Sequence, residues 1–224
     1  MCRAVVPHAD LRRDPAPFTW FANDASVLLW SFERETRLTL EGPGFVTLAV
    51  VDAQGRAARA SDGTRLLVAD ACNNRILVYD ALPTTTFAPA DVVIGQATMT
   101  ETACTACSLD EPFNYVERLA VGGGRLVVAE WFGHHVLVWN SIPTANGVEP
   151  DLVLGQPGTG ATCVANDDDQ NGVSGDPSGR TFNRPWDTWT DGDRLLVTDY
   201  DNHRVLLWES FPTSDFTPAD VPDG

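Results

Sequence analysis

The sequence predicts an all-β protein built from repeated four-stranded antiparallel sheets, the blades of a β-propeller, and three observations support this. One short passage is written three times, with its acidic residue at Asp70, Glu130 and Asp199. Each copy is followed by an apolar residue, a proline and a threonine, and the first two then continue into a further apolar run. Apolar segments near 116–121 and 185–190 precede the second and third copies. Self-similarity of this kind is typical of repeat architectures, and four strands per repeat of a propeller blade.

Each copy of the passage reads as a β-hairpin. In the first copy, residues 65–70 and 75–79 are short and rich in Leu, Val and Ile, and Asn73 and Asn74 between them favour a turn. These runs are apolar at nearly every position, so we expect both faces of each sheet to be buried. The aromatic residue that ends each hairpin, Tyr79 in the first, is expected to serve blade packing.

The repeats divide the chain into three blades and a remnant. The blades span 53–96, 113–156 and 182–221, and insertions 97–112 and 157–181 precede the last two. Residues 1–52 form an N-terminal segment and a degenerate preceding blade, and the third blade is expected to be truncated within its last strand. Closed propellers typically need four to eight blades. We therefore expect either a piece of a larger, six-bladed propeller or a chain that self-associates through its open blade edges.

Composition excludes several classes of function. The chain has 15 basic and 31 acidic residues, a net charge of −16, so we expect no nucleic-acid partner. Every basic residue is arginine, which removes Schiff-base chemistry and a phosphate-loop lysine. No apolar run is long enough to span a bilayer, and the N-terminus does not read as a signal peptide. The expectation is a soluble chain, secreted or periplasmic if a signal sequence precedes it.

The hairpin passage resembles the NHL repeat, a β-propeller family. The residues that carry the resemblance are Val68-Ala69-Asp70 with Asn73-Asn74-Arg75-Ile76, and Val197-Thr198-Asp199 with Asn202-His203-Arg204-Val205. The middle copy departs with Glu130, Gly133 and His135, and Gly155-Gln156-Pro157 is similar to the tail of bacterial NHL-type proteins. Over 53–221 the resemblance implies a non-catalytic module that binds or scaffolds a protein or small-molecule ligand. Relatives of the fold include lyases and lactonases. The alternative is therefore that the chain is part of a metal-dependent propeller enzyme.

Because each blade has four antiparallel strands, the hairpin turns and the two insertions emerge on the same face. Loops on a rigid scaffold are where functional residues are usually found. Trp131, His134 and His135 lie in or beside the second turn and are candidate ligand contacts. With His203 at the position equivalent to His134, the histidines also suggest a zinc site, although the repeat itself supplies that position. The paired acids and arginines, such as Asp70 and Arg75, are interpreted as turn-closing ion pairs rather than a charged functional ring.

The insertions add a candidate metal site and a candidate disulfide. Asp167, Asp169 and Asn171, followed by glycine, match the opening of an EF-hand-type calcium loop. The twelfth position lacks the bidentate glutamate, so a solvated acidic turn is the alternative. The candidate disulfide cysteines are Cys104, Cys107 and Cys163. No catalytic triad, phosphate loop or dinucleotide fingerprint is present, so we predict no catalytic residue and no required cofactor, with calcium as the one candidate ion.

Overall fold

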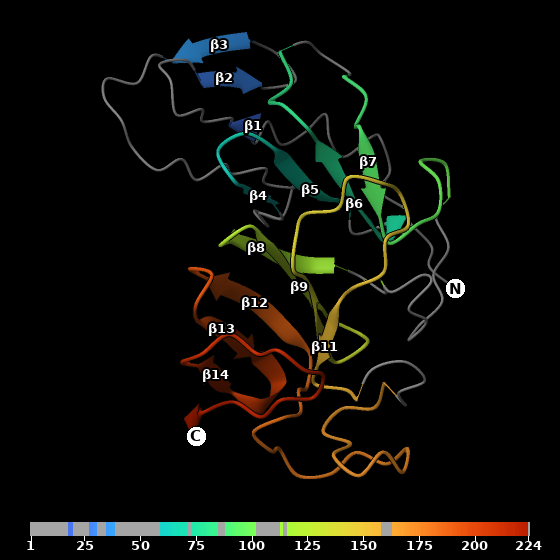
Figure 1. Ribbon diagram of the computed structural model, residues 1–224, viewed down its shortest axis with the longest axis vertical. Helices are drawn as coiled ribbons and strands as arrows, with labels where there is room; N and C mark the ends of the chain where they lie inside the picture. Colours follow the sequence, from blue (N-terminus) through green and yellow to red (C-terminus); the bar gives the residue numbers. More distant parts are fainter. Residues whose placement is uncertain are drawn as a thin grey trace, which may run out of the picture.

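The computed structural model is an all-β chain whose sheets follow one another as propeller blades (Figure 1). It describes strand residues 18–19, 27–30 and 35–38, and residues 59–70, 73–84, 88–101, 113, 116–157 and 163–223. In this part of the chain each of the three repeats forms a four-stranded antiparallel sheet with its strands in chain order. None of the helices described there is long and apolar enough to cross a membrane.

The strands lie where the repeats predict them. Blade 1 consists of β4 (Arg59–Ser61), β5 (Leu66–Asp70), β6 (Arg75–Tyr79) and β7 (Val92–Ile94). Blade 2 consists of β8 (Val116–Gly122), β9 (Arg125–Glu130), β10 (His135–Trp139) and β11 (Leu152–Leu154). Blade 3 consists of β12 (Pro185–Thr190), β13 (Leu195–Asp199), β14 (Arg204–Trp208) and β15 (Val221–Asp223). A further sheet, β1 (Phe18–Thr19), β2 (Val27–Trp30) and β3 (Glu35–Leu38), contains the segment interpreted as a blade remnant.

The third repeat has all four strands, although the sequence predicts that it is truncated within the last one. β15 pairs with β14 in antiparallel register, with Val221 opposite Leu207 and Asp223 opposite Val205. It has 3 residues, the same length as the outer strands β7 and β11. An outer strand of this repeat needs only three residues to pair, so the short segment after Asp220 completes the sheet.

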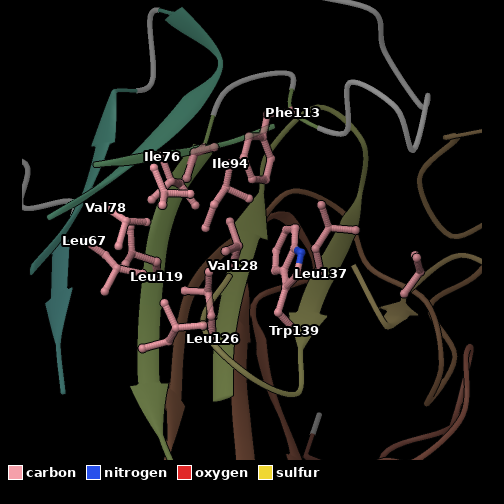
Figure 2. Close-up of a cluster of buried hydrophobic side chains, with 14 residues drawn as sticks. Leu67, Ile76, Val78, Ile94, Phe113, Leu119, Leu126, Val128, Leu137 and Trp139 are labelled. Carbon is pink, nitrogen blue, oxygen red and sulfur yellow. The ribbon is translucent and has the colours of Figure 1, made fainter. Parts of the chain in front are cut away.

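The core lies between the blades, where the face of one sheet packs on the face of the next (Figure 2). At the first junction Leu67, Ile76 and Val78 of blade 1 meet Leu126, Val128, Leu137 and Trp139 of blade 2. At the second junction Val127, Val136 and Val138 of blade 2 meet Leu195, Val197, Leu206 and Trp208 of blade 3. Successive side chains of a strand point to opposite faces, so blade 2 supplies one set to each neighbour. Blade 2 is therefore apolar and buried on both faces, as predicted.

Blades 1 and 3 depart from that expectation. Along β6 and β14 the side chains alternate between buried and partly exposed positions, whereas every side chain of β10 is buried. Blade 2 packs against blade 1 on one side and against blade 3 on the other, and β4, β8 and β12 follow one another in a single row (Figure 1). The apolar pattern is similar in all three repeats, and the core side chains of blade 2 are fully buried where blades 1 and 3 pack on them.

A phenylalanine recurs ahead of the second and third hairpins, and its packing explains why a glycine recurs after each preceding blade. Phe113 packs against Trp139 with ring centroids 6.1 Å apart, and Phe182 packs against Trp208 at 6.3 Å. Each phenylalanine ring fills the space beside a glycine of the preceding blade, where a Cβ would clash with the ring; for Phe113 that glycine is Gly95. Gly95 also has a φ of +87°, which favours glycine. The glycine of the Gly-Gln tail is thus a requirement of blade packing.

Candidate functional site

The hairpin turns and the blade connections meet at one end of the sheets, which we call the turn face. The side-chain amide of Gln96, just after blade 1, donates to the carbonyl oxygen of Asn74 in the first turn at 2.9 Å. Arg204, just after the third turn, donates to the carbonyl oxygens of Ser178 and Thr181 in the second insertion at 2.7 and 2.8 Å. The turns and insertions therefore share one face in the described residues, as strand parity predicts.

The repeat's charged residues close the hairpins. The groups are Asp70, Asn73 and Arg75 in blade 1 and Asp199, Asn202 and Arg204 in blade 3. In both blades the arginine Nε lies 2.8 Å from a carboxylate oxygen, and the asparagine amide donates to the same carboxylate. Burial raises the pKa of Asp199, although hydrogen bonds from the Asn183 N–H, Asn202 and Arg204 oppose the shift. The geometry is that of a turn-closing ion pair.

The three departures of the middle blade from this pattern occur at one spot and compensate one another. A carboxylate oxygen of Glu130 accepts a hydrogen bond from the Gly133 N–H and lies 3.4 Å from Nε2 of His135. A Cβ on residue 133 would clash with that oxygen, so the longer glutamate occupies the space an asparagine side chain would need. Glu130 and His135 are both buried. The structure therefore places His135 inside the hairpin, although the sequence suggested it as a ligand contact.

His134 is fixed by the backbone around it. Its φ is +53°, close to the +50° of Asn74 and the +55° of His203 at the same position of the other turns. Asparagine and histidine are enriched in this left-handed region, which explains why they recur here. Nδ1 of His134 accepts a hydrogen bond from the Arg184 backbone N–H at 3.1 Å. Burial, and then the charge of Arg184, lower the pKa of His134 to about 4, so it is neutral at pH 7.

The zinc site that the histidines suggest has no geometric counterpart in the described part of the chain. His135 faces Glu130 inside the hairpin, and His134 is held against the backbone before β12. Within the residues that the structure describes, no three or more His, Cys, Asp or Glu side chains are arranged to hold a metal ion.

Four aromatic side chains gather on the turn face; we call Trp131, Phe132, Trp186 and Tyr200 the aromatic cluster. Trp131 meets Trp186 nearly edge-on, with centroids 5.0 Å apart and an interplanar angle of 75°. Tyr200 lies 5.5 Å from Trp131 and 5.4 Å from Trp186, and Phe132 lies 6.5 Å from Trp131. Tyr200 is 55% exposed, Phe132 is exposed and both tryptophans are partly exposed. The rings thus pack against one another and form an ordered surface that is exposed to solvent.

A cation already lies on this surface. The guanidinium carbon of Arg184 is 5.6 Å from the centroid of the Trp131 ring, within the range of a cation–π contact. The same side chain pairs with a carboxylate oxygen of Asp201 at 2.9 Å. The exposed face of the second turn therefore combines aromatic rings, a positive group and a carboxylate.

The sequence prediction included Trp131 but missed its neighbours. Tyr200 directly follows Asp199, as Trp131 directly follows Glu130, so aligning the repeats in register would have paired the two. Trp186 has no such signal. The register of β12 on β13 shifts between Pro185 and Asp187, and that of β8 on β9 shifts at the equivalent place, but the residue there is Glu117, which is not aromatic.

The acidic segment of the second insertion is closed by its own hydrogen bonds. The two carboxylate oxygens of Asp167 accept the backbone N–H groups of Asn171 and Gly172, each at 2.9 Å. The Asn171 amide donates to Asp169, also at 2.9 Å. Asp167 is buried and Asp169 is exposed. These contacts are those of an ordered acidic turn, and calcium binding at Asp167, Asp169 and Asn171 stays a prediction.

Cys163, at the start of the described part of that insertion, is disulfide-bonded. Cys104 and Cys107 lie outside the described residues, as do Cys2 and Cys72. Pairing of Cys163 with Cys104 or Cys107 would join the two insertions, and it stays a proposal.

Comparison with known proteins gives the following matches. Residues 6–61 match the Penicillin-Binding Protein C-terminus Family. A search of curated proteins found no match. Among solved structures the chain is similar to Hsv2 of Kluyveromyces lactis, with 14% identity and a TM-score of 0.46, over 89% of this chain and 50% of that one. It is also similar to the WD40 repeats of RRP9, with 14% identity and a TM-score of 0.41, over 87% and 44%.

A third similar structure is the Polycomb Repressive Complex 2 of Chaetomium thermophilum, with 12% identity and a TM-score of 0.44, over 89% of this chain and 37% of that chain. The chain thus spans about half the length of the solved chains it matches, or less. The description of the blades given above comes from the strand pairing of this chain itself.

Proposed function

We propose that this chain is an NHL-type propeller module that binds a partner through the aromatic cluster and carries out no catalysis. The hairpin motif supports the NHL assignment, because its acid, asparagine and arginine form the same ion-paired turn in blades 1 and 3. The observation that carries the binding function is the cluster of Trp131, Trp186 and Tyr200. Aromatic side chains that supply a rigid, partly exposed surface are typical of binding hot spots.

The partner's chemistry follows from charge. The chain carries a net charge of −16, which attracts basic segments and repels acidic ones. The guanidinium of Arg184 lies over the ring of Trp131, which supports a planar cation as the ligand of this surface. We therefore propose that the ligand is an arginine-rich segment of a partner protein, whose guanidinium groups stack on the cluster.

Tryptophan fluorescence tests this proposal directly. Titration with an arginine nonapeptide should quench the emission of the wild-type chain, and a glutamate nonapeptide should not. Trp131→Ala should weaken binding at least about tenfold, as expected when a central aromatic contact is truncated. Binding should also weaken with salt, since part of the attraction is electrostatic.

Phe216→Ala is the matched control. The Phe216 ring also lies against a guanidinium, that of Arg180 at 5.4 Å, but it belongs to the β14–β15 connection and is not part of the aromatic cluster. This variant should bind the peptide as the wild-type chain does. Equal losses in both variants, or no difference between the two peptides, would overturn the proposed site.

The alternative, part of a metal-dependent lyase or lactonase, would need the histidines of the turn face to act together. His134 instead accepts from a backbone N–H, and His135 is packed against Glu130. A zinc content that is lost in His135→Ala while the fold is kept would restore that alternative.

A further inference from the structure

Arg184 and Asp201 form an ion pair on the turn face that the repeat itself does not supply. Counted from the Phe-Asn pair and the hairpin acid that the two repeats share, Arg184 aligns with Tyr115 and Asp201 aligns with Phe132. The residues that do recur in this chain serve blade packing and turn closure. A charged pair at two positions where the second repeat carries no charge is therefore a feature of this turn alone.

The backbone of Arg184 is held independently of its side chain. Its N–H donates to Nδ1 of His134 at 3.1 Å, and its φ of +57° lies in the left-handed region. The next residue, Pro185, begins β12. Residues other than glycine are uncommon in this conformation and persist where the surrounding structure fixes them. The side chain can therefore leave its position while the backbone stays in place.

The side chain of Arg184 contributes little to holding the fold. Its contacts in the described residues are with the Trp131 ring, 5.6 Å from the guanidinium carbon, and with an Asp201 carboxylate oxygen at 2.9 Å. The side chains of this ion pair are 44% and 27% exposed. Arg204, by contrast, is 8% exposed and also donates to two backbone carbonyl oxygens. Exposed ion pairs and exposed cation–π contacts are weak, so another cation can replace Arg184.

Trp131 and Asp201 together offer the two kinds of contact that suit one guanidinium group. The ring attracts a planar cation to its face, and the carboxylate accepts hydrogen bonds from N–H groups at the rim of the same cation. The guanidinium of Arg184 makes both contacts at once. A lysine ammonium is compact and strongly hydrated, so it fits this combination less well.

We infer that the Trp131 ring and the Asp201 carboxylate form a guanidinium subsite, which Arg184 occupies in the unbound chain and which an arginine of the partner takes over on binding. The subsite rests on the proposed function and sets how tightly the partner binds. Two guanidinium groups cannot occupy the same place, so Arg184 must leave before the partner's arginine can stack. Because only the fraction of chains with a vacated subsite can bind there, Arg184 acts as an internal competitor that lowers the apparent affinity.

Arg180 provides the matched control, because its surroundings are of the same kind. Its guanidinium carbon lies 5.4 Å from the centroid of the Phe216 ring, its Nε lies 3.7 Å from an Asp168 carboxylate oxygen, and its side chain is 46% exposed. Replacing Arg180 changes the net charge of the chain by the same amount as replacing Arg184. A difference between the two variants therefore reports the subsite, and not the general attraction of an acidic chain for a basic peptide.

Titration with the arginine nonapeptide, followed by tryptophan fluorescence, tests the inference. Arg184→Gln should bind about three- to tenfold more tightly than the wild-type chain, the gain expected when a weak internal competitor is removed. Arg180→Gln should keep the wild-type affinity. Adding Asp201→Asn to Arg184→Gln should abolish the gain, because the incoming guanidinium loses its acceptor, whereas adding Asp168→Asn should leave it. Both single variants should unfold at nearly the wild-type urea concentration.

A probe with one arginine separates the subsite from the proposed partner. Acetyl-arginine amide should change the tryptophan emission of Arg184→Gln at concentrations that leave the wild-type chain unchanged, and acetyl-lysine amide should change neither. This response without any nonapeptide binding would support the subsite and overturn the proposed partner. Equal nonapeptide affinities of Arg184→Gln and Arg180→Gln, or an Arg184→Gln chain that does not respond to acetyl-arginine amide, would overturn the subsite. Nonapeptide binding by the wild-type chain would in that case still support the proposed function.

Discussion

The hairpins of blades 1 and 3 hold the same ion pair in different surroundings. Asp70–Arg75 and Asp199–Arg204 have the same 2.8 Å separation, yet the side chains of the first pair are 25% and 17% exposed and those of the second 0% and 8%. Residues 178–183 cover the second pair: the carbonyl oxygens of Ser178 and Thr181 accept from Arg204, and the Asn183 N–H donates to Asp199. The comparison teaches that a repeat motif sets local geometry, while the segment packed on it sets its energetic weight.

The largest predicted effect comes from breaking the covered pair. Asp199→Ala should lower the free energy of unfolding by about 3–5 kcal/mol, because Arg204 is left buried without its counterion and the Asn183 N–H loses its acceptor. Asp70→Ala should cost about 1 kcal/mol or less, since water can solvate Arg75. Urea denaturation of both variants measures the difference, and equal losses would show that the deeper burial of the second pair is irrelevant.

The middle hairpin sharpens the comparison, because it replaces the ion pair altogether. Gly133→Asn restores the residue found in the other turns but should destabilise the chain by about 2 kcal/mol, since the new side chain meets the Glu130 carboxylate. Adding Glu130→Asp shortens the acid and should recover about half of that loss. The coupling between the two substitutions, measured in a double-mutant cycle by urea denaturation, should be favourable. Simple additivity would mean that the departures are independent.

The same distinction, between local pattern and the structure packed on it, explains how much of this molecule the sequence predicted. The strands of the hairpins, the packing role of Trp139 and the turn-closing pairs depend on local pattern, and all were predictable. The burial of Val136 and the exposure of its equivalent Val205 were not, because identical residues differ only in what lies over them. In the site, Trp131 was predicted and Tyr200 was readable from the repeat. Trp186 was not, because the equivalent residue of blade 2 is Glu117 and the repeat therefore gives no aromatic pattern at this position.

A smaller effect should distinguish the second turn from the third. Through His134 of the second turn, the free energy of unfolding should depend on pH. The pKa of His134 is lowered to about 4 from an ordinary 6.5, so below pH 6.5 the unfolded chain takes up a proton that the folded chain refuses. This stability is fully present above pH 6.5, falls as the pH drops toward 4, and then levels off. The partly exposed ring limits the loss to on the order of 1 kcal/mol.

His134→Asn, which installs the residue of the first turn, should remove this component of the pH dependence. Urea denaturation at about pH 7 and about pH 4.5 provides the measurement. His203→Asn at the same position of the third turn is the control, because that side chain is exposed, and the wild-type loss should persist in it. Identical pH profiles for wild type and His134→Asn would contradict the prediction.

The smallest expected effect concerns the insertion that supports the third turn. Asn166 exchanges hydrogen bonds with Asn202 at 2.8–2.9 Å, so the segment from Asp167 to Gly172 begins directly beside that hairpin. If this segment takes up calcium, the ion should raise the melting temperature by about one or two degrees, because the turn is already closed by its own hydrogen bonds.

Asp169→Asn should abolish the rise, since it removes an exposed carboxylate ligand and leaves the contacts of Asp167 intact. Asp193→Asn changes an exposed acid far from this loop and should leave the rise unchanged. Thermal unfolding with calcium or with a chelator decides the matter: no rise in the wild-type chain would mean that the acidic turn supports the hairpin by hydrogen bonding alone.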